Sequence, residues 1–210
     1  MKILVIGAHG KVGKRLIRCL INEGHRPIAM IRNKKHMKEM KKLGAETVIA
    51  DLEEDFFHAY ENVEAIIFTA GSGGHTGPEK TISVDQEGAI KSIDLAEKMG
   101  IKRYIMVSAQ GSREPEQPSE IQHYYKAKAI ADERLMKSSL NYTIFRPGRL
   151  LDDAGKGYVL LSSRQLGRSS TSRDNLAQTI AVSVMMKNTF YKVIEIVEGS
   201  IPIREALLQL

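Results

Sequence analysis

The sequence contains one cysteine, no tryptophan and no long hydrophobic run. With Cys19 alone, the chain can form neither an internal disulfide nor a thiolate metal cluster, and its neighbours "RLIRCLI" predict a buried position on a helix. The six histidines include no His-x-x-x-His pair, so we expect no metal site. The apolar stretches are far shorter than the ~20 residues of a membrane span. Because the N-terminal stretch enters a glycine-rich turn instead of continuing as a secretory signal, we expect a cytoplasmic protein.

The remaining composition is typical of a globular protein. Of the 210 residues, 42% are hydrophobic and 27% are charged, which predicts a single domain over residues 1–210. The net charge of +6 would allow a polyanionic partner, but the basic residues gather within 32–42 instead of forming a tract interleaved with aromatics. We therefore expect a small-molecule partner, and neither nucleic acid nor membrane. The basic run is either a solvated helix face or a phosphate site. The sequence does not specify the oligomeric state, and a homodimer is possible.

Short apolar runs alternate with amphipathic segments along most of the chain. This alternation predicts an α/β fold with a doubly wound parallel sheet that is covered on both faces. After Gly148 the pattern becomes a loop rich in glycine and serine, followed by a helix over 173–186 that Ser172 or Thr171 caps, a strand in "KVIEIVEG", and a closing helix in "PIREALLQL" with proline in its first turn. The expected strands are Ile3 to Ile6, Pro27 to Ile31, Thr47 to Ala50, Ala65 to Thr69, Arg103 to Val107, Tyr142 to Phe145 and a short one at Tyr158 to Leu161.

The first strand leads directly into "GAHGKVGKRLI", with glycines at positions 7, 10 and 13. Such a turn allows a sharp bend, a close approach of a pyrophosphate and tight packing of the helix, whose first amide groups then face the anion. A merely structural turn is the alternative, but the position between a clear strand and a clear helix favours a Rossmann-type dinucleotide site. Its expected residues are Gly7, Ala8, Gly10, Lys11, Val12 and Gly13.

The end of the second strand indicates which cofactor this site would bind. An acid is normally found there when the cofactor lacks the 2'-phosphate, but "AMIRNKK" offers no acid before Glu39. Arg32 and Asn33, with Lys34 in reserve, could instead meet the phosphate, for which a guanidinium is well suited. The sequence therefore favours NADP(H) over NAD(H).

Two further strand ends lead toward the same crevice. Asp51 in "IADL", followed by Leu52, could accept from the adenine amino group, or it could cap a helix. In "FTAGSGG", Ala70 and Gly71 leave room for the cofactor. We divide the chain accordingly into a cofactor-binding core, residues 1–148, and a C-terminal substrate-side portion, residues 149–210.

A helix expected over residues 120–137 contains Tyr124 and Lys128, four positions apart in "HYYKAK". At about 100° per residue, Tyr124 shares an apolar stripe with Ala127, Ala131 and Leu135, and Lys128 falls inside this face, whereas Lys126 falls on the opposite side. A lysine there either snorkels to water or marks a functional site. An adjacent ammonium lowers the pKa of a tyrosine, which could then protonate an alkoxide during hydride transfer. Ser108, with Ser112 in reserve, could orient the carbonyl.

These residues resemble the short-chain dehydrogenase/reductase superfamily over nearly the whole chain. The similar segments are "GAHGKVG", "IRN", "ADL", "YIMVS", the Tyr124 and Lys128 pair, and "RPG", which adds Pro147 and Gly148 to the expected cofactor contacts. The short length resembles atypical members related to flavin and biliverdin-IX-beta reductases, NmrA-like regulators, and bacterial proteins described as epimerases or dehydratases. In "SVDQEG", Asp85 stands where extended members have asparagine. The C-terminal portion is shorter than the sugar-nucleotide domain of true epimerases.

The resemblance implies an oxidoreductase that passes hydride from NADP(H) to a small carbonyl, quinone or flavin-like acceptor. Tyr124 would be the acid, Lys128 its tuner and ribose ligand, and Ser108 the carbonyl-orienting group. An NADP(H)-binding sensor without turnover is the alternative, and an epimerase or dehydratase is a weaker one. The acceptor pocket is expected between loops 72–80, 109–120 and 149–170.

Overall fold

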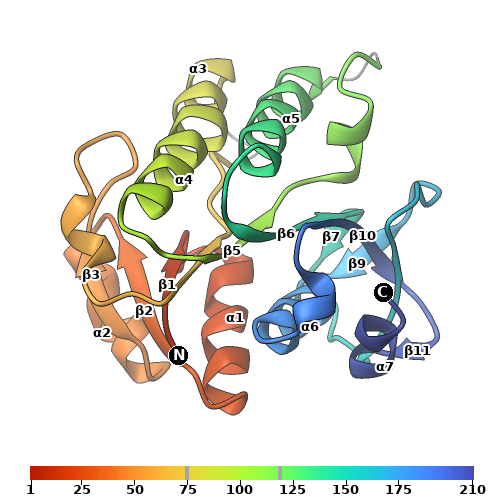
Figure 1. The fold of residues 1–210 in the computed structure, drawn as a ribbon, viewed down its shortest axis with the longest axis horizontal. Coiled ribbons are helices and arrows are strands. Elements are labelled where there is room, and N and C mark those ends of the chain that lie inside the picture. Colours follow the sequence, from red (N-terminus) through yellow and green to blue (C-terminus); the bar gives the residue numbers. More distant parts are fainter. Residues whose placement is uncertain (74–75, 118–119) are drawn as a thin grey trace.

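A computed structural model describes residues 1–73, 76–117 and 120–210. Nine strands form its central sheet: β1 (Lys2–Ile6), β2 (Arg26–Ile31), β3 (Glu46–Ile49), β4 (Ala65–Phe68), β5 (Arg103–Val107), β6 (Asn141–Pro147), β8 (Tyr158–Ser162), β10 (Lys192–Glu198) and β11 (Ile201–Pro202). Their order is β11-β8-β10-β6-β5-β4-β1-β2-β3 (Figure 1). Each predicted strand is present, with ends shifted by at most two residues, because runs of apolar side chains buried on both faces are a strong signal.

The sheet is parallel from β3 through β10, and only β8 and β11 run antiparallel to their neighbours. Strand β1 lies between β2 and β4, so that Ile6 is opposite both Met30 and Phe68. The strand order reverses direction at β1. This is the switch point at which doubly wound sheets bind ligands, beyond the carboxyl ends of the strands.

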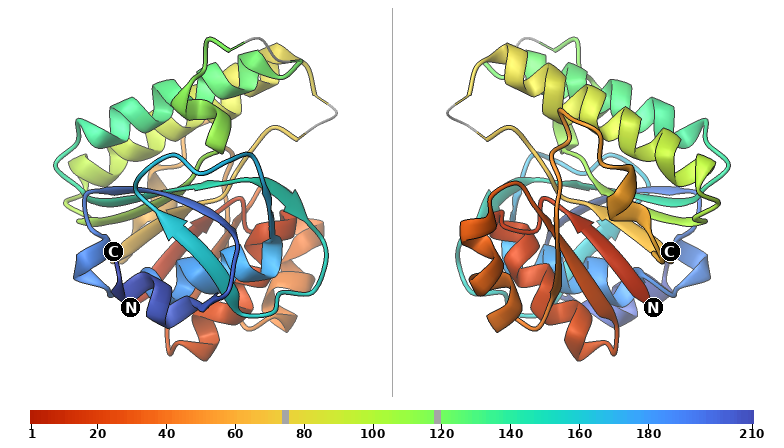
Figure 2. Two further views of the ribbon diagram at one scale, coloured as in Figure 1. Left: turned by 90° about the vertical axis from the view of Figure 1, so that its right-hand side faces the viewer. Right: turned by 90° about the vertical axis from the view of Figure 1, so that its left-hand side faces the viewer.

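Helices cover both faces of the sheet, as Figure 2 shows. One face carries α1 (Lys11–Asn22), α2 (Met37–Lys42), α6 (Arg173–Ser183) and α7 (Ile203–Leu208), and the other carries α4 (Ala89–Lys98) and α5 (Gln122–Met136). Shorter elements are α3 (Pro78–Lys80), the π-helix η3 (Thr81–Gly88) and the 3-10 helices η1 (Lys34–His36), η2 (Phe57–Tyr60), η4 (Gln110–Arg113) and η5 (Lys187–Thr189). The doubly wound α/β fold is thus confirmed.

Packing of α1 on the sheet fixes the direction in which the glycine loop leaves β1. Leu16, Ile17 and Leu20 follow a helical spacing and are fully buried in the core shared with α6. Burial of each such side chain contributes about 1.5–3 kcal/mol. Cys19, predicted to be buried, is partly buried against the same core.

The C-terminal portion contains more secondary structure than the sequence predicted. Strands β7 (Arg149–Leu151) and β9 (Ser170–Ser172) pair in a small parallel sheet inside the predicted loop. Ser172, not Thr171, caps α6 by accepting from the Asn175 amide at 3.0 Å. The helix ends at Ser183 instead of 186, and Pro202 caps α7 instead of lying in its first turn. No helix in the described residues is long and apolar enough to cross a membrane.

Candidate functional site

The glycine loop lets the start of α1 pack closely against the end of β1, and lets β1 pack closely against the residues that follow β4. Gly7 has φ +83°, and a Cβ there would lie 2.5 Å from the Ala70 nitrogen. A Cβ on Gly13 would lie 2.4 Å from the Gly7 carbonyl oxygen. Both glycines are therefore required by packing alone, whichever ligand the loop binds. Ala8 and Val12 are buried and belong to the core.

Gly10 and Lys11 form the exposed part of the loop. Gly10 is the N-cap of α1 and supplies no side chain to the first amide groups of this 12-residue helix. Ala70, which packs against Gly7, and the exposed Gly71 lie two and three residues beyond the end of β4. An uncapped helix N-terminus flanked by small residues fits a pyrophosphate. The Lys11 ammonium pairs with Asp152 at 2.6 Å and so ties the loop to the C-terminal portion.

The residues predicted to meet a 2'-phosphate lie just beyond β2. Arg32 is exposed, whereas the Asn33 side chain accepts from the Lys35 amide at 2.9 Å and caps η1. Asn33 therefore has a local structural task, and Arg32 is the residue better placed to meet an anion.

Sequence reasoning missed a cluster at the same edge. The rings of His9, in the glycine loop, and His36 stack with centroids 3.5 Å apart. Glu39 contacts His9 Nε2 at 3.1 Å and Lys14 Nζ at 2.7 Å. Burial, Lys14 and His36 lower the pKa of His9, against the opposing effect of Glu39. The donor atoms of His9, His36 and Glu39 lie within 4.8 Å of one another, close enough for a metal ion, but Lys14 already holds the carboxylate and its charge opposes a cation.

Asp51, the predicted adenine-side acid, lies two residues beyond the end of β3. The Asp51 carboxylate accepts from the Glu53 amide at 3.1 Å, so it holds a turn and caps no helix. The side chain is only partly buried at the sheet edge, and its role toward adenine stays a prediction. Leu52 is buried against Gly88 and belongs to the core.

Tyr124 and Lys128 lie one turn apart on α5. The Lys128 Nζ is 5.7 Å from the centroid of the Tyr124 ring and 3.1 Å from Asp85 Oδ1, with both charged side chains buried. Burial raises the pKa of Tyr124, while the ammonium acts in the opposite direction, as predicted, and Asp85 adds to the increase. Lys126, as predicted, lies on the surface, where it pairs with Glu116 at 2.9 Å.

Ser108 is buried and faces a second buried acid, Asp132. Asp132 Oδ2 accepts from the hydroxyls of Ser108 at 2.8 Å and Ser112 at 3.0 Å, and from Arg146 Nε at 2.9 Å. Asp132 follows Lys128 by four residues, so the helical spacing that revealed Lys128 could also have revealed this acid. The sequence alone does not single out Asp132, because an aspartate on a helix is usually exposed.

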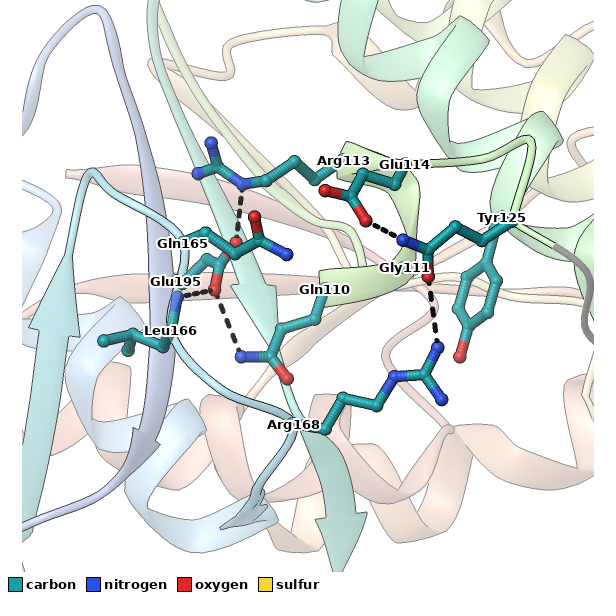
Figure 3. Close-up of a pocket in the computed structure, with 10 residues that line it drawn as sticks. Gln110, Gly111, Arg113, Glu114, Tyr125, Gln165, Leu166, Arg168 and Glu195 are labelled. Atoms are coloured by element: carbon teal, nitrogen blue, oxygen red, sulfur yellow. Dashed lines mark hydrogen bonds and ion pairs between the residues drawn. The ribbon is translucent and has the colours of Figure 1, made fainter.

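A pocket lies beyond β5, between two of the predicted acceptor loops (Figure 3). Its cavity volume is about 60 Å³, and it is partly open to solvent. Buried Glu195 accepts from Arg113 Nε at 2.8 Å and the Leu166 amide at 2.7 Å, while Arg168 contacts only the Gln117 oxygen, at 3.4 Å, among the described residues. The lining residues are Gln110, Gly111, Arg113, Glu114, Gln117, Tyr125, Gln165, Leu166, Arg168 and Glu195.

The pocket adjoins the predicted cofactor residues through one contact, at Gly148. The Gln110 side chain reaches Gly148, because a Cβ on Gly148 would lie 3.2 Å from Gln110 Oε1. Within the pocket, the Tyr125 ring packs on Gly111. Pro147 is buried at the end of β6 and Gly148 is partly buried. The predicted loop 72–80 does not line this pocket in its described part, and residues 74–75 and 118–119 lie outside the described residues.

Comparison with known proteins identifies the family and the fold of the chain. The model of a family described as NAD(P)H-binding matches residues 7–186. Over the full length of both chains, the sequence is 43% identical to the Bacillus subtilis protein named "Uncharacterized sugar epimerase YhfK". A proposed NAD-dependent epimerase/dehydratase from Bacillus halodurans has a similar structure, with TM-score 0.98, 46% identity and full coverage of both chains. The Escherichia coli protein ChuY, described as an anaerobillin reductase, has TM-score 0.80 and 26% identity, covering 95% of this chain and 98% of that one.

Proposed function

The chain belongs to the NAD(P)H-binding family, and we propose that it is an NADP(H)-dependent oxidoreductase that reduces a small carbonyl, quinone or flavin-like acceptor. The observation that carries this proposal is the pairing of Tyr124 with Lys128 on α5, at the carboxyl ends of β4 and β5. The similarity to ChuY, which is described as an anaerobillin reductase, supports the same class of reaction. When bound, the nicotinamide would supply the hydride.

The chain's own residues would position the cofactor and move a proton. The uncapped amides of α1 beyond Gly10 would bind the pyrophosphate, and exposed Arg32 would select the 2'-phosphate. The Tyr124 hydroxyl would donate its proton to the alkoxide oxygen that develops on the acceptor. Because an alkoxide is far more basic than a phenolate, this donation stays favourable even with the pKa of Tyr124 above its usual value.

We place the acceptor in the pocket beside Gln110 and Tyr125. Arg113 neutralises the buried Glu195, and Arg168 has no carboxylate partner within ion-pair distance among the described residues. Gln110 and Arg113 donate to Glu195, so Arg168 is the lining guanidinium best placed to bind an oxygen of a polar acceptor. A carboxylate on such an acceptor would be bound best near Arg168.

Binding and turnover measured separately test this function. NADPH binding would be followed by fluorescence and its oxidation by absorbance with aldehydes, ketones, quinones and flavins. For carbonyl acceptors, Tyr124→Phe should lower kcat by about 10²–10⁴-fold with little change in NADPH affinity. Tyr158→Phe, which alters an exposed tyrosine, is the matched control. Tight NADPH binding with no turnover of any acceptor would reject the enzyme.

That outcome would favour a second function, an NADP(H)-binding sensor. Two observations support it: the Lys128 ammonium is paired with Asp85, and the Ser108 hydroxyl is bonded to Asp132. Both side chains are thus engaged inside the protein. A sensor needs only the glycine loop and the residues around it, and Tyr124→Phe would leave its response unchanged.

A further inference from the structure

Lys128 and Asp85 form an ion pair in the interior of the protein. The Nζ to Oδ1 distance is 3.1 Å, and the exposed fractions of the two side chains are 3% and 0%. The ammonium also donates weakly to the carbonyl oxygens of Ala70, at 3.4 Å, and Val107, at 3.3 Å. The ammonium therefore has two carbonyl oxygens as hydrogen-bond acceptors and one carboxylate oxygen as its ion-pair partner, at the point where β4 and β5 end.

The backbone around Asp85 is built to hold the carboxylate in this place. Asp85 lies within the π-helix η3, and segments of this kind frequently occur at functional sites. Its Oδ2 accepts from the Ser72 amide at 2.8 Å, and its Oδ1 would lie 3.2 Å from a Cβ on Gly71. Asp85 thus connects η3 to the loop after β4, the loop that would lie against the cofactor.

The other charged groups near Lys128 balance one another. Asp132, on the next turn of α5, is paired with Arg146 of β6 at 2.9 Å. The neighbouring Tyr124 phenol is neutral. Two buried cations and two buried anions therefore sum to zero beside Tyr124, and Asp85 is the member that lies directly on Lys128.

We propose that Asp85 is a positioning residue that fixes the Lys128 ammonium below the Ala70 to Ser72 loop and cancels its charge, so that Tyr124 stays a neutral proton donor. Where the ammonium is unpaired, its positive charge favours the phenolate form of the tyrosine. The inference rests on the proposed role of Tyr124 as the acid, but the ion pair can be tested without turnover.

The size of the expected effect follows from the distance. An unpaired charge about 4–6 Å away shifts a pKa by about one to three units, and the 5.7 Å from Nζ to the Tyr124 ring falls in that range. A carboxylate 3.1 Å from the ammonium removes most of this field. The raised pKa of Tyr124, due to burial with the contribution of Asp85 opposing that of Lys128, agrees with the cancellation.

The experiment is a tyrosine titration by NMR with 13Cζ-labelled tyrosine from about pH 7 to the highest pH at which the protein stays folded, in which Tyr124→Phe assigns the resonance among the seven tyrosines. In Asp85→Asn, the Tyr124 midpoint should fall by about one to three units, because the ammonium loses its counter-charge. In Lys128→Met it should rise, because the carboxylate is left alone. The double variant has neither charge and should lie near the wild type, between the two single variants.

Glu87→Gln is the matched control, since it removes one exposed negative charge from the same element and should leave the midpoint unchanged. If either single variant unfolds, the other still tests the sign against the double variant. A midpoint that stays constant or rises in Asp85→Asn, or one that Glu87→Gln lowers equally, would overturn the proposal. Absence of turnover in the wild type would reject the enzyme function and leave this titration result unaffected.

Discussion

The Ser108 hydroxyl donates a 2.8 Å hydrogen bond to the Asp132 carboxylate, and both residues are buried. Arg146 holds the same Oδ2 oxygen, and burial raises the pKa of Asp132 against the opposing effect of this guanidinium. The hydroxyl predicted to orient a carbonyl thus already satisfies a buried charge. Loss of a donor to a buried carboxylate is costly.

We expect Ser108→Ala to act mainly on stability. The free energy of unfolding should fall by about 1–3 kcal/mol, because one of the donors to Asp132 is removed, while NADPH affinity stays within about twofold, which is about 0.4 kcal/mol. Denaturant unfolding and fluorescence titration measure the two quantities. Ser163→Ala, at an exposed serine, is the control. Loss of turnover at unchanged stability would instead favour the carbonyl-orienting role.

The sequence predicted the sheet and the glycine loop well, because apolar runs and glycine spacing are local signals. It also separated Lys126 from Lys128 by helical geometry. The sequence could not predict the partners of the buried charged side chains, since these partners come from distant segments of the chain. Asp85, for example, pairs with Lys128 although it lies 43 residues earlier in the chain (128 − 85). The strands β7 and β9 were missed because each has only three residues, too few to show an alternating pattern, and β9 is also entirely polar.

The second prediction concerns Glu39, whose carboxylate bridges His9 and Lys14 beside the expected 2'-phosphate position. A fixed negative charge there would repel the phosphate and occupy Lys14. Glu39→Gln should therefore tighten NADPH binding by about fivefold, the effect of about 1 kcal/mol between two charges in water, and leave NADH affinity unchanged. Arg32→Gln should have the opposite effect on NADPH.

Fluorescence titrations with both cofactors measure this selectivity, and NADH serves as the internal control for damage to the loop. Glu54→Gln removes an exposed charge elsewhere and should alter neither affinity. If Glu39→Gln weakens NADH instead, then Glu39 holds the ribose hydroxyls, and the preference for NADP(H) is wrong.

Gly13 provides a third prediction, in which two effects compete. Alanine is a better helix former than glycine by about 1 kcal/mol, but its Cβ would lie 2.4 Å from the Gly7 carbonyl and 2.6 Å from that of Ala8. Steric overlap with rigid backbone exceeds the helical gain. Gly13→Ala should lower the unfolding temperature and weaken NADPH binding, whereas Gly77→Ala, with nothing within 4 Å, should change neither. An unchanged unfolding temperature in Gly13→Ala would show that α1 can shift away from β1.

The last prediction concerns Arg103, a cation buried at the start of β5. It donates to the Val184 carbonyl at 2.9 Å, the Asn141 carbonyl at 2.8 Å and the Thr143 hydroxyl at 2.8 Å. Its guanidinium lies 4.5 Å from the centroid of the Phe190 ring. Among the described residues it has no carboxylate within ion-pair distance. Burial lowers its pKa to about 9, so the charge persists at neutral pH and neutral oxygens satisfy it.

Arg103 therefore joins β5 and β6 to the end of α6, and its replacement should destabilise the chain more than any loss of a surface charge. Arg103→Met would leave several buried oxygens without donors, which predicts a loss of about 3 kcal/mol or more in the free energy of unfolding. Arg103→Lys keeps the charge but has too few donors in the wrong geometry, and should recover only part of the loss. Denaturant unfolding measures both, with Arg18→Met at an exposed position of α1 as the control. Equal stability of Arg103→Met and the wild type would mean that water or a shift of α6 satisfies these oxygens as well as the guanidinium does.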